Sequence, residues 1–186
     1  MKMVRIPALI SVVGGILLAN TACALTPEER SYLEHASKRE PLSTPHEDQI
    51  LRFEADVTGD GDPEIFYSLL SFRDGKQGNV WSVYTRSQSG SLIPMGDVTF
   101  SPKAFQPAAW EKDSSVRGFY AYGPGGAGAG SLAFYEVGVG GVTERERTRI
   151  APTGADKETY DRIFRQAGTE GSGTQIEPVQ IPVPAD

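Results

Sequence analysis

The chain has 186 residues, a formal net charge of −6 and a hydrophobic fraction of 39%, which suit one globular domain with its own core. Phosphate contacts require clustered lysine and arginine, so a chain this acidic argues against nucleic acid and against an anionic membrane as partners. The 21 glycines and 13 prolines favour short strands joined by turns over a helix bundle.

Residues 1–24 have the pattern of a cleavable signal peptide. Lys2 and Arg5 precede an apolar run, and Ala22-Cys23-Ala24 supplies the small residues of a cleavage site. The run is shorter than the roughly 20 apolar residues of a membrane span, so no membrane span is expected in the mature chain. We therefore expect cleavage after Ala24 and a periplasmic or secreted mature protein.

Cys23 raises one alternative, a lipid anchor attached to this cysteine. A lipobox requires leucine three positions earlier, where this chain has Asn20, so we favour the cleaved signal. Cleavage would remove the only cysteine and two positive charges but no acidic residue, so the net charge would fall from −6 to −8. The mature domain would then have no disulfide bond, although its compartment is oxidising.

The mature chain begins with a strong helix start. Thr26 can cap the helix, Pro27 occupies the first helical position, and Glu29 completes a capping box. The helix is expected to continue to about Arg39 and to end before Pro41.

The segments after this helix alternate in a way that is typical of strands. Together with the helix they predict a mainly β (α+β) domain over 25–168, built as an antiparallel meander. Leu51 to Val57 alternates apolar and polar residues, as a half-buried strand does. Ile65 to Phe72 is apolar on both faces, which is typical of a central strand. Further strands are expected, in chain order, at Val80–Thr85, Leu92–Ile93, Val98–Phe100, Val116–Tyr122, Ser131–Val139 and Val142–Ile150.

The last predicted strand carries charges on both faces, which is typical of a sheet edge that discourages pairing with another chain. Its arginines could instead bind an acidic partner; they are Arg145, Arg147 and Arg149. A short helix from about Asp156 to Gln166 and an extended tail over 169–186 complete the predicted organisation.

The best candidate for chemistry is the segment over 56–64, in which oxygen-bearing side chains alternate before a glycine. Calcium takes six to eight oxygen ligands, which such a loop supplies from side chains and main chain. The candidate ligands are Asp56, Thr58, Asp60 and Glu64 through their side chains and Asp62 through its carbonyl.

This loop resembles the calcium loops of EF-hands and, more closely, those of FG-GAP-type β-hairpins. In the latter the closing acid stands at the ninth position between two strands, as Glu64 does here. An EF-hand would place its glutamate at the twelfth position, which is Tyr67, and would need flanking helices. The resemblance implies a Ca²⁺ ion, with a weaker site because Thr58 stands where Asp or Asn is usual. Magnesium is disfavoured by its strict octahedral geometry, and the alternative to a metal site is a polar hairpin turn.

The glycine-rich segment from Gly123 to Gly130 separates two predicted strands. Its spacing matches a dinucleotide-binding motif, but a strand follows it where that motif requires a helix. An exposed loop could instead contact a partner, and an aromatic residue in an irregular segment could anchor one. The candidate partner-contact residues are Trp110, Gly125, Gly126 and Gly128.

No catalytic motif stands out in the sequence. His35 and His46 have no nucleophile motif near them, and no histidine pair has zinc-binding spacing. We therefore expect an exported, calcium-binding, non-enzymatic binding protein. Exported β-rich inhibitors with an EF-hand-like loop are similar, which implies an inhibitor or immunity protein whose partner is a secreted toxin or cell-wall hydrolase. The alternatives are a small secreted hydrolase using Asp/Glu chemistry and a structural or adhesive envelope module.

Overall fold

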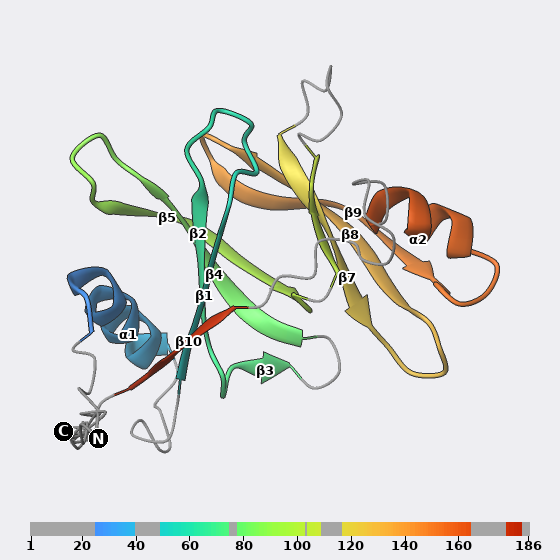
Figure 1. Ribbon diagram of the computed structural model, residues 1–186, viewed down its shortest axis with the longest axis horizontal. Helices are drawn as coiled ribbons and strands as arrows, with labels where there is room; N and C mark the ends of the chain where they lie inside the picture. Colours follow the sequence, from blue (N-terminus) through green and yellow to red (C-terminus); the bar gives the residue numbers. More distant parts are fainter. Residues whose placement is uncertain are drawn as a thin grey trace, which may run out of the picture.

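Two antiparallel sheets pack face to face, with a helix on the outer side of each (Figure 1). The computed structural model describes residues 25–39, 49–74, 78–102, 104–108, 117–164 and 178–183. The predicted signal peptide, His46 and Trp110 lie outside the described residues. None of the described helices is long and apolar enough to cross a membrane.

Sheet A has six strands. Five follow the order β10-β1-β2-β4-β3, and the sixth, β5, also pairs with β4. Its strands are β1 (Gln49–Ala55), β2 (Glu64–Leu69), β3 (Arg73–Asp74), β4 (Gly78–Arg86), β5 (Leu92–Phe100) and β10 (Val179–Pro182). Sheet B has four strands in chain order: β6 (Phe105–Pro107), β7 (Gly118–Pro124), β8 (Gly130–Gly138) and β9 (Gly141–Ile150). The helices are α1 (Pro27–Arg39) and α2 (Lys157–Phe164).

The structure confirms a mainly β, antiparallel domain with a helix near each end. It also differs from a simple meander, because the strands divide into two sheets. The two short strands expected around Leu92 and Val98 form one continuous strand, β5, which pairs with β4 along its length. The predicted tail contributes β10, which pairs with the edge of β1.

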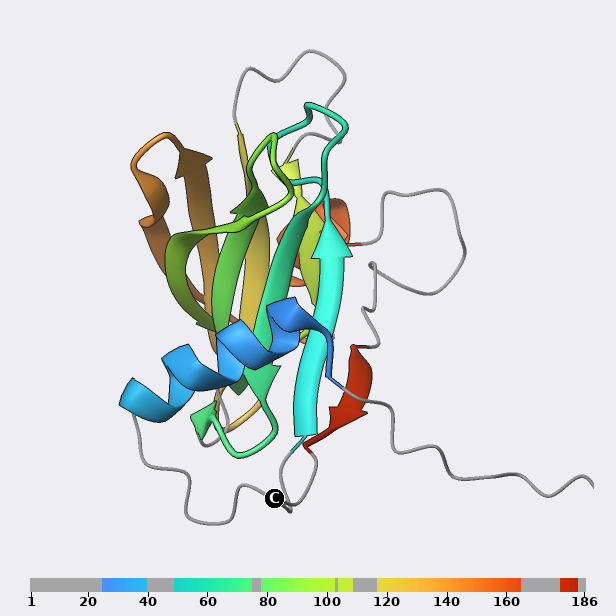
Figure 2. The same cartoon turned by 90° about the vertical axis from the view of Figure 1, so that its left-hand side faces the viewer.

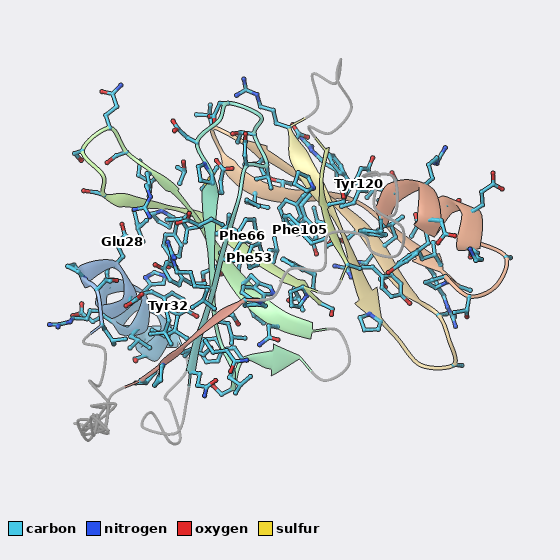
Figure 3. All side chains as sticks on the ribbon, viewed as in Figure 1. Glu28, Tyr32, Phe53, Phe66, Phe105 and Tyr120 are labelled. Carbon is cyan, nitrogen blue, oxygen red and sulfur yellow. The ribbon has the colours of Figure 1, made fainter. Side chains whose placement is uncertain are left out.

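Aromatic side chains fill the space between the two sheets (Figure 3). Phe53 of β1 stacks on Phe66 of β2 with ring centroids 4.4 Å apart, and Phe66 lies 5.6 Å from Phe105 of sheet B. β2 is buried at all six positions, as expected of a central strand. The alternation predicted for β1 is confirmed, because Leu51 and Phe53 belong to this core.

Helix α1 lies across the outer face of sheet A (Figure 2). The capping box is confirmed: the Glu29 amide donates to Thr26 Oγ1 at 3.2 Å, and the Thr26 amide donates to Glu29 Oε2 at 2.7 Å. Tyr32, 2% exposed, stacks on Tyr67 of β2 with ring centroids 5.1 Å apart. Helix α2 covers the outer face of sheet B, where Phe164 is 1% exposed.

Candidate metal site

The segment over 56–63 connects β1 to β2 at one end of the sandwich (Figure 1). Strands flank it on both sides, as expected for a β-hairpin loop and unlike an EF-hand. Gly59 has φ 73° and Gly61 has φ 93°, a conformation that residues with a side chain rarely adopt. The sequence therefore folds here into a tight turn that depends on its two glycines.

Hydrogen bonds within the loop occupy two of its aspartates. The Asp56 carboxylate accepts from the amides of Gly59 at 2.6 Å and Gly61 at 3.0 Å. Asp60 Oδ1 accepts from the amide of Asp62 at 2.9 Å. These bonds are typical of aspartate in turns, and they hold the loop without any ion.

Glu64 differs from the other acids of the loop because it is buried, with 2% of its surface exposed. Its Oε2 atom accepts from the amide of Val57 at 3.1 Å, and no basic side chain of the described part of the chain forms a salt bridge with it. Burial raises the pKa of Glu64, and the nearby negative charges of Asp60 and Asp56 add to the increase. The loop thus encloses a carboxylate that has an amide donor but no countercharge among the described side chains.

A hydroxyl group of the loop lacks a hydrogen-bond partner in the described structure. Thr58 Oγ1 is buried and has no hydrogen-bond partner among the described residues. An orphaned buried hydroxyl is unfavourable unless a hydrogen-bond donor, an acceptor or a cation reaches it. Because Oγ1 is one of the predicted calcium ligands, its state fits a loop that receives an ion.

The predicted ligands do not converge on one point in this conformation. Within the described ranges, no group of three or more His, Cys, Asp or Glu side chains is placed to hold a metal ion. Asp60 and Asp62 are exposed, whereas Glu64 is buried beneath the loop. The calcium ligand set therefore stays a prediction, and binding would require Asp56 and Asp60 to exchange loop amides for the ion.

The loop is fastened to sheet B through Val57, a contact that the sequence did not reveal. Val57 is fully buried, and its carbonyl accepts from the amide of Gly118 at 2.7 Å. Gly118 begins β7, so Val57 binds Glu64 through its amide and sheet B through its carbonyl. Only the alternating pattern of the β1 segment, which places Val57 on its apolar face, hints at this role.

The predicted partner-contact glycines, unlike Trp110, are described, and they lie at the opposite end of β7 from the acidic loop (Figure 1). Residues 124–128 are exposed and form the turn of the β7–β8 hairpin, closed by a bond of 2.8 Å from the Gly125 amide to the Ala129 carbonyl. Strand β8 follows directly, as expected, so the glycine spacing is not a dinucleotide-binding motif. Gly125, Gly126 and Gly128 are accessible, but the structure does not bring them near the acidic loop.

Comparisons with known proteins identify no relative of this chain. No protein-family model matches the chain, and neither the curated proteins nor the solved structures gave a match.

Proposed function

We propose that this protein is an exported calcium-binding domain that acts by binding another protein and not by catalysis. The observation that carries the calcium site is Glu64, a residue that is 2% exposed and whose carboxylate lacks a basic partner among the described side chains. A buried charge without a countercharge is unfavourable, and it either takes up a proton or attracts a cation.

Calcium fits this loop better than other common cations. Carboxylates, a hydroxyl and a carbonyl are all hard oxygen donors, which calcium accepts in a flexible geometry. Asp60 and Asp62 are exposed, so they can turn toward an ion without disturbing the core. Thr58 Oγ1, buried without a hydrogen-bond partner in the described structure, would gain a ligand role. Bound calcium would neutralise the repulsion between Glu64 and the loop aspartates.

The proposed binding role follows from the part of the molecule that calcium would stabilise, which is the acidic loop and its connection to sheet B. Val57 connects Glu64 to the first residue of β7, so an ion that fixes the loop would also fix the joint between the two sheets. A rigid end of a β-sandwich is a suitable platform for a protein partner, because preformed contact loops lose less entropy on binding. The narrower proposal is an inhibitor or immunity protein against a secreted toxin or cell-wall hydrolase.

Isothermal titration calorimetry and thermal unfolding, with calcium, with magnesium and with EGTA, test the metal site. We expect calcium to raise the melting temperature, because a ligand selective for the native state stabilises it. Glu64→Gln keeps an oxygen that can accept from the Val57 amide but removes the charge, and Asp60→Asn does the same toward the Asp62 amide. Both variants should lose most of the calcium response.

Glu158→Gln is the matched control, since Glu158 is an exposed acid on α2 away from the loop. It should keep the full calcium response. Calcium that leaves the melting temperature and the calorimetric signal unchanged would reduce the loop to a hydrogen-bonded turn. For the partner, affinity capture from periplasmic extract in calcium and in EGTA should retain a protein in calcium only; capture of none would contradict the binding role.

A further inference from the structure

Strand β9 forms an outer edge of sheet B, and its exposure is unusually complete. It pairs with β8 on one side, and no other described strand is its ladder partner. All seven residues from Thr143 to Arg149 are exposed. β5 comes close at the beginning of the strand, where a Cβ on Gly141 would lie 2.2 Å from the Met95 carbonyl oxygen. The remaining edge presents backbone groups that another strand could bind.

A bulge sets which side chains of β9 share a face. Tyr135 of β8 lies opposite Glu144 and Phe134 lies opposite Glu146, so Arg145 is the extra residue. Residues three apart on a regular strand face opposite sides of the sheet. Across this bulge, Glu144 and Arg147 share one face, and the two guanidinium nitrogens of Arg147 bind the Glu144 carboxylate at 2.8 and 2.6 Å.

The same bulge puts Thr143 and Thr148 together on the other face, because they lie opposite Glu136 and Leu132 of β8. The sequence of residues 143–148 is Thr-Glu-Arg-Glu-Arg-Thr, in which each residue of the first half has a complementary or identical residue at the matching place of the second half, counted from the end. In reverse order every acid meets an arginine and every threonine meets a threonine. This pattern is complementary to itself in an antiparallel pair.

We propose that β9 is a homodimer interface, in which the β9 strands of two copies pair antiparallel around a two-fold axis between residues 145 and 146. Glu144 then lies opposite Arg147 of the second copy, and Thr143 lies opposite Thr148 of the second copy. Each contact occurs twice by symmetry. Sheet B of each copy would continue into the other, forming one sheet of eight strands.

Charge distinguishes this edge from one that excludes a second copy. Like charges directly opposite each other are destabilising, whereas opposite charges stabilise a cross-strand pair. The segment over 143–148 carries two acids and two arginines, so its net charge is zero in a chain of net charge −6. The hydrogen bond from Arg147 lowers the pKa of Glu144, which keeps this acid ionised at neutral pH. The acids of one β9 therefore attract the arginines of a second β9 along this segment.

Sedimentation velocity over a range of protein concentrations tests the interface. The wild-type protein should show a concentration-dependent dimer that weakens as salt increases, because exposed ion pairs are screened. Glu144→Arg or Arg147→Glu places like charges opposite each other twice and should weaken dimerisation by about tenfold or more. The double variant Glu144→Arg/Arg147→Glu restores opposite charges and should dimerise like wild type.

Mixing the two single variants is the sharpest form of the experiment. One variant would carry arginine at both 144 and 147, and the other glutamate at both. Two copies of the same variant would repel each other, whereas one copy of each would attract. Two proteins that are monomeric alone should form a dimer when mixed, which changes within one chain cannot explain. Circular dichroism checks that each variant is folded.

Arg162→Glu, an exposed charge reversal on α2, is the matched control and should leave dimerisation unchanged. A wild-type protein that stays monomeric at all concentrations would overturn the proposal and leave β9 as a guarded edge. A dimer that is insensitive to both single substitutions would also overturn it, because its interface would then lie elsewhere.

Discussion

The amide of Gly118 donates a hydrogen bond of 2.7 Å to the carbonyl of Val57, joining the start of β7 to the loop that follows β1. The two residues lie far apart in the sequence, and both are buried. Gly118 has φ 148°, and a Cβ there would lie 2.0 Å from the carbonyl oxygen of Tyr135. This joint therefore has space for glycine only.

Gly118→Ala should destabilise the domain by about 3 kcal/mol, because the added methyl group forces both a backbone shift and a strained φ. Urea unfolding followed by tryptophan fluorescence measures the loss. Gly126→Ala is the control, since no atom lies within 4 Å of its Cβ position, and it should change stability little. Equal effects of the two substitutions would show that the joint tolerates a side chain.

The strands were predictable where the pattern is local. The alternation from Leu51 to Phe53 predicts the buried face of β1, and the apolar run of β2 predicts its complete burial. Thr26 and Glu29 predict the start of α1. Division into two sheets was not predictable, because periodicity shows which face of a strand is buried but not which strand lies beside it. β10 was missed because it is short and lies in a proline-rich tail, and its pairing with the edge of β1 has no local signal in the sequence.

The acidic loop was predictable in position but not in conformation. Spacing and glycines place a turn over 56–63 between two strands, and the structure agrees. The sequence gives no sign that Asp56 binds the amides of Gly59 and Gly61, since an acid in a turn can bind either amides or an ion. The burial of Glu64 depends on packing against the core, which only the folded chain supplies.

The stability of the calcium-free protein should depend on pH through Glu64. The folded-state pKa of Glu64 is raised above its ordinary value of 4.5, so ionisation is harder in the folded chain than in the unfolded chain. Its contribution is present below the unfolded pKa and is lost as the pH rises through the folded pKa. We therefore expect Glu64 to lower the free energy of unfolding in EGTA as the pH increases from 4 toward neutrality.

Urea unfolding of wild type and of Glu64→Gln at several pH values isolates this effect. The difference between the two proteins removes the contributions of the other acids. The variant should gain stability relative to wild type as the pH rises, since it carries no buried charge. Saturating calcium should reverse the order at neutral pH. A difference that does not change with pH would contradict the raised pKa of Glu64.

The turn of the β7–β8 hairpin contains a conformation that its sequence does not favour. Ala127 has φ 57°, next to Gly128 with φ 73°, so an alanine occupies the left-handed region. Ala127→Gly should raise the free energy of unfolding by about 0.5–1 kcal/mol, because glycine adopts this conformation without strain. Ala129→Gly, at a position without positive φ, should lower it. Thermal unfolding of the pair measures both signs.

Phe66 is the side chain on which the two sheets meet, since its ring contacts Phe53 of β1 and, across the core, both Phe105 and Phe119 of sheet B. Phe66→Ala should cost about 3–5 kcal/mol, because it removes a fully buried ring from the centre of the sandwich. Phe134, half-buried on the outer face of sheet B, is the matched control, and Phe134→Ala should cost clearly less because part of its ring already contacts water. Chemical denaturation of both variants gives the comparison. If the two losses were equal, the aromatic layer between the sheets would not be the main source of stability, and the joint at Val57 and Gly118 would have to hold the sheets together largely by itself.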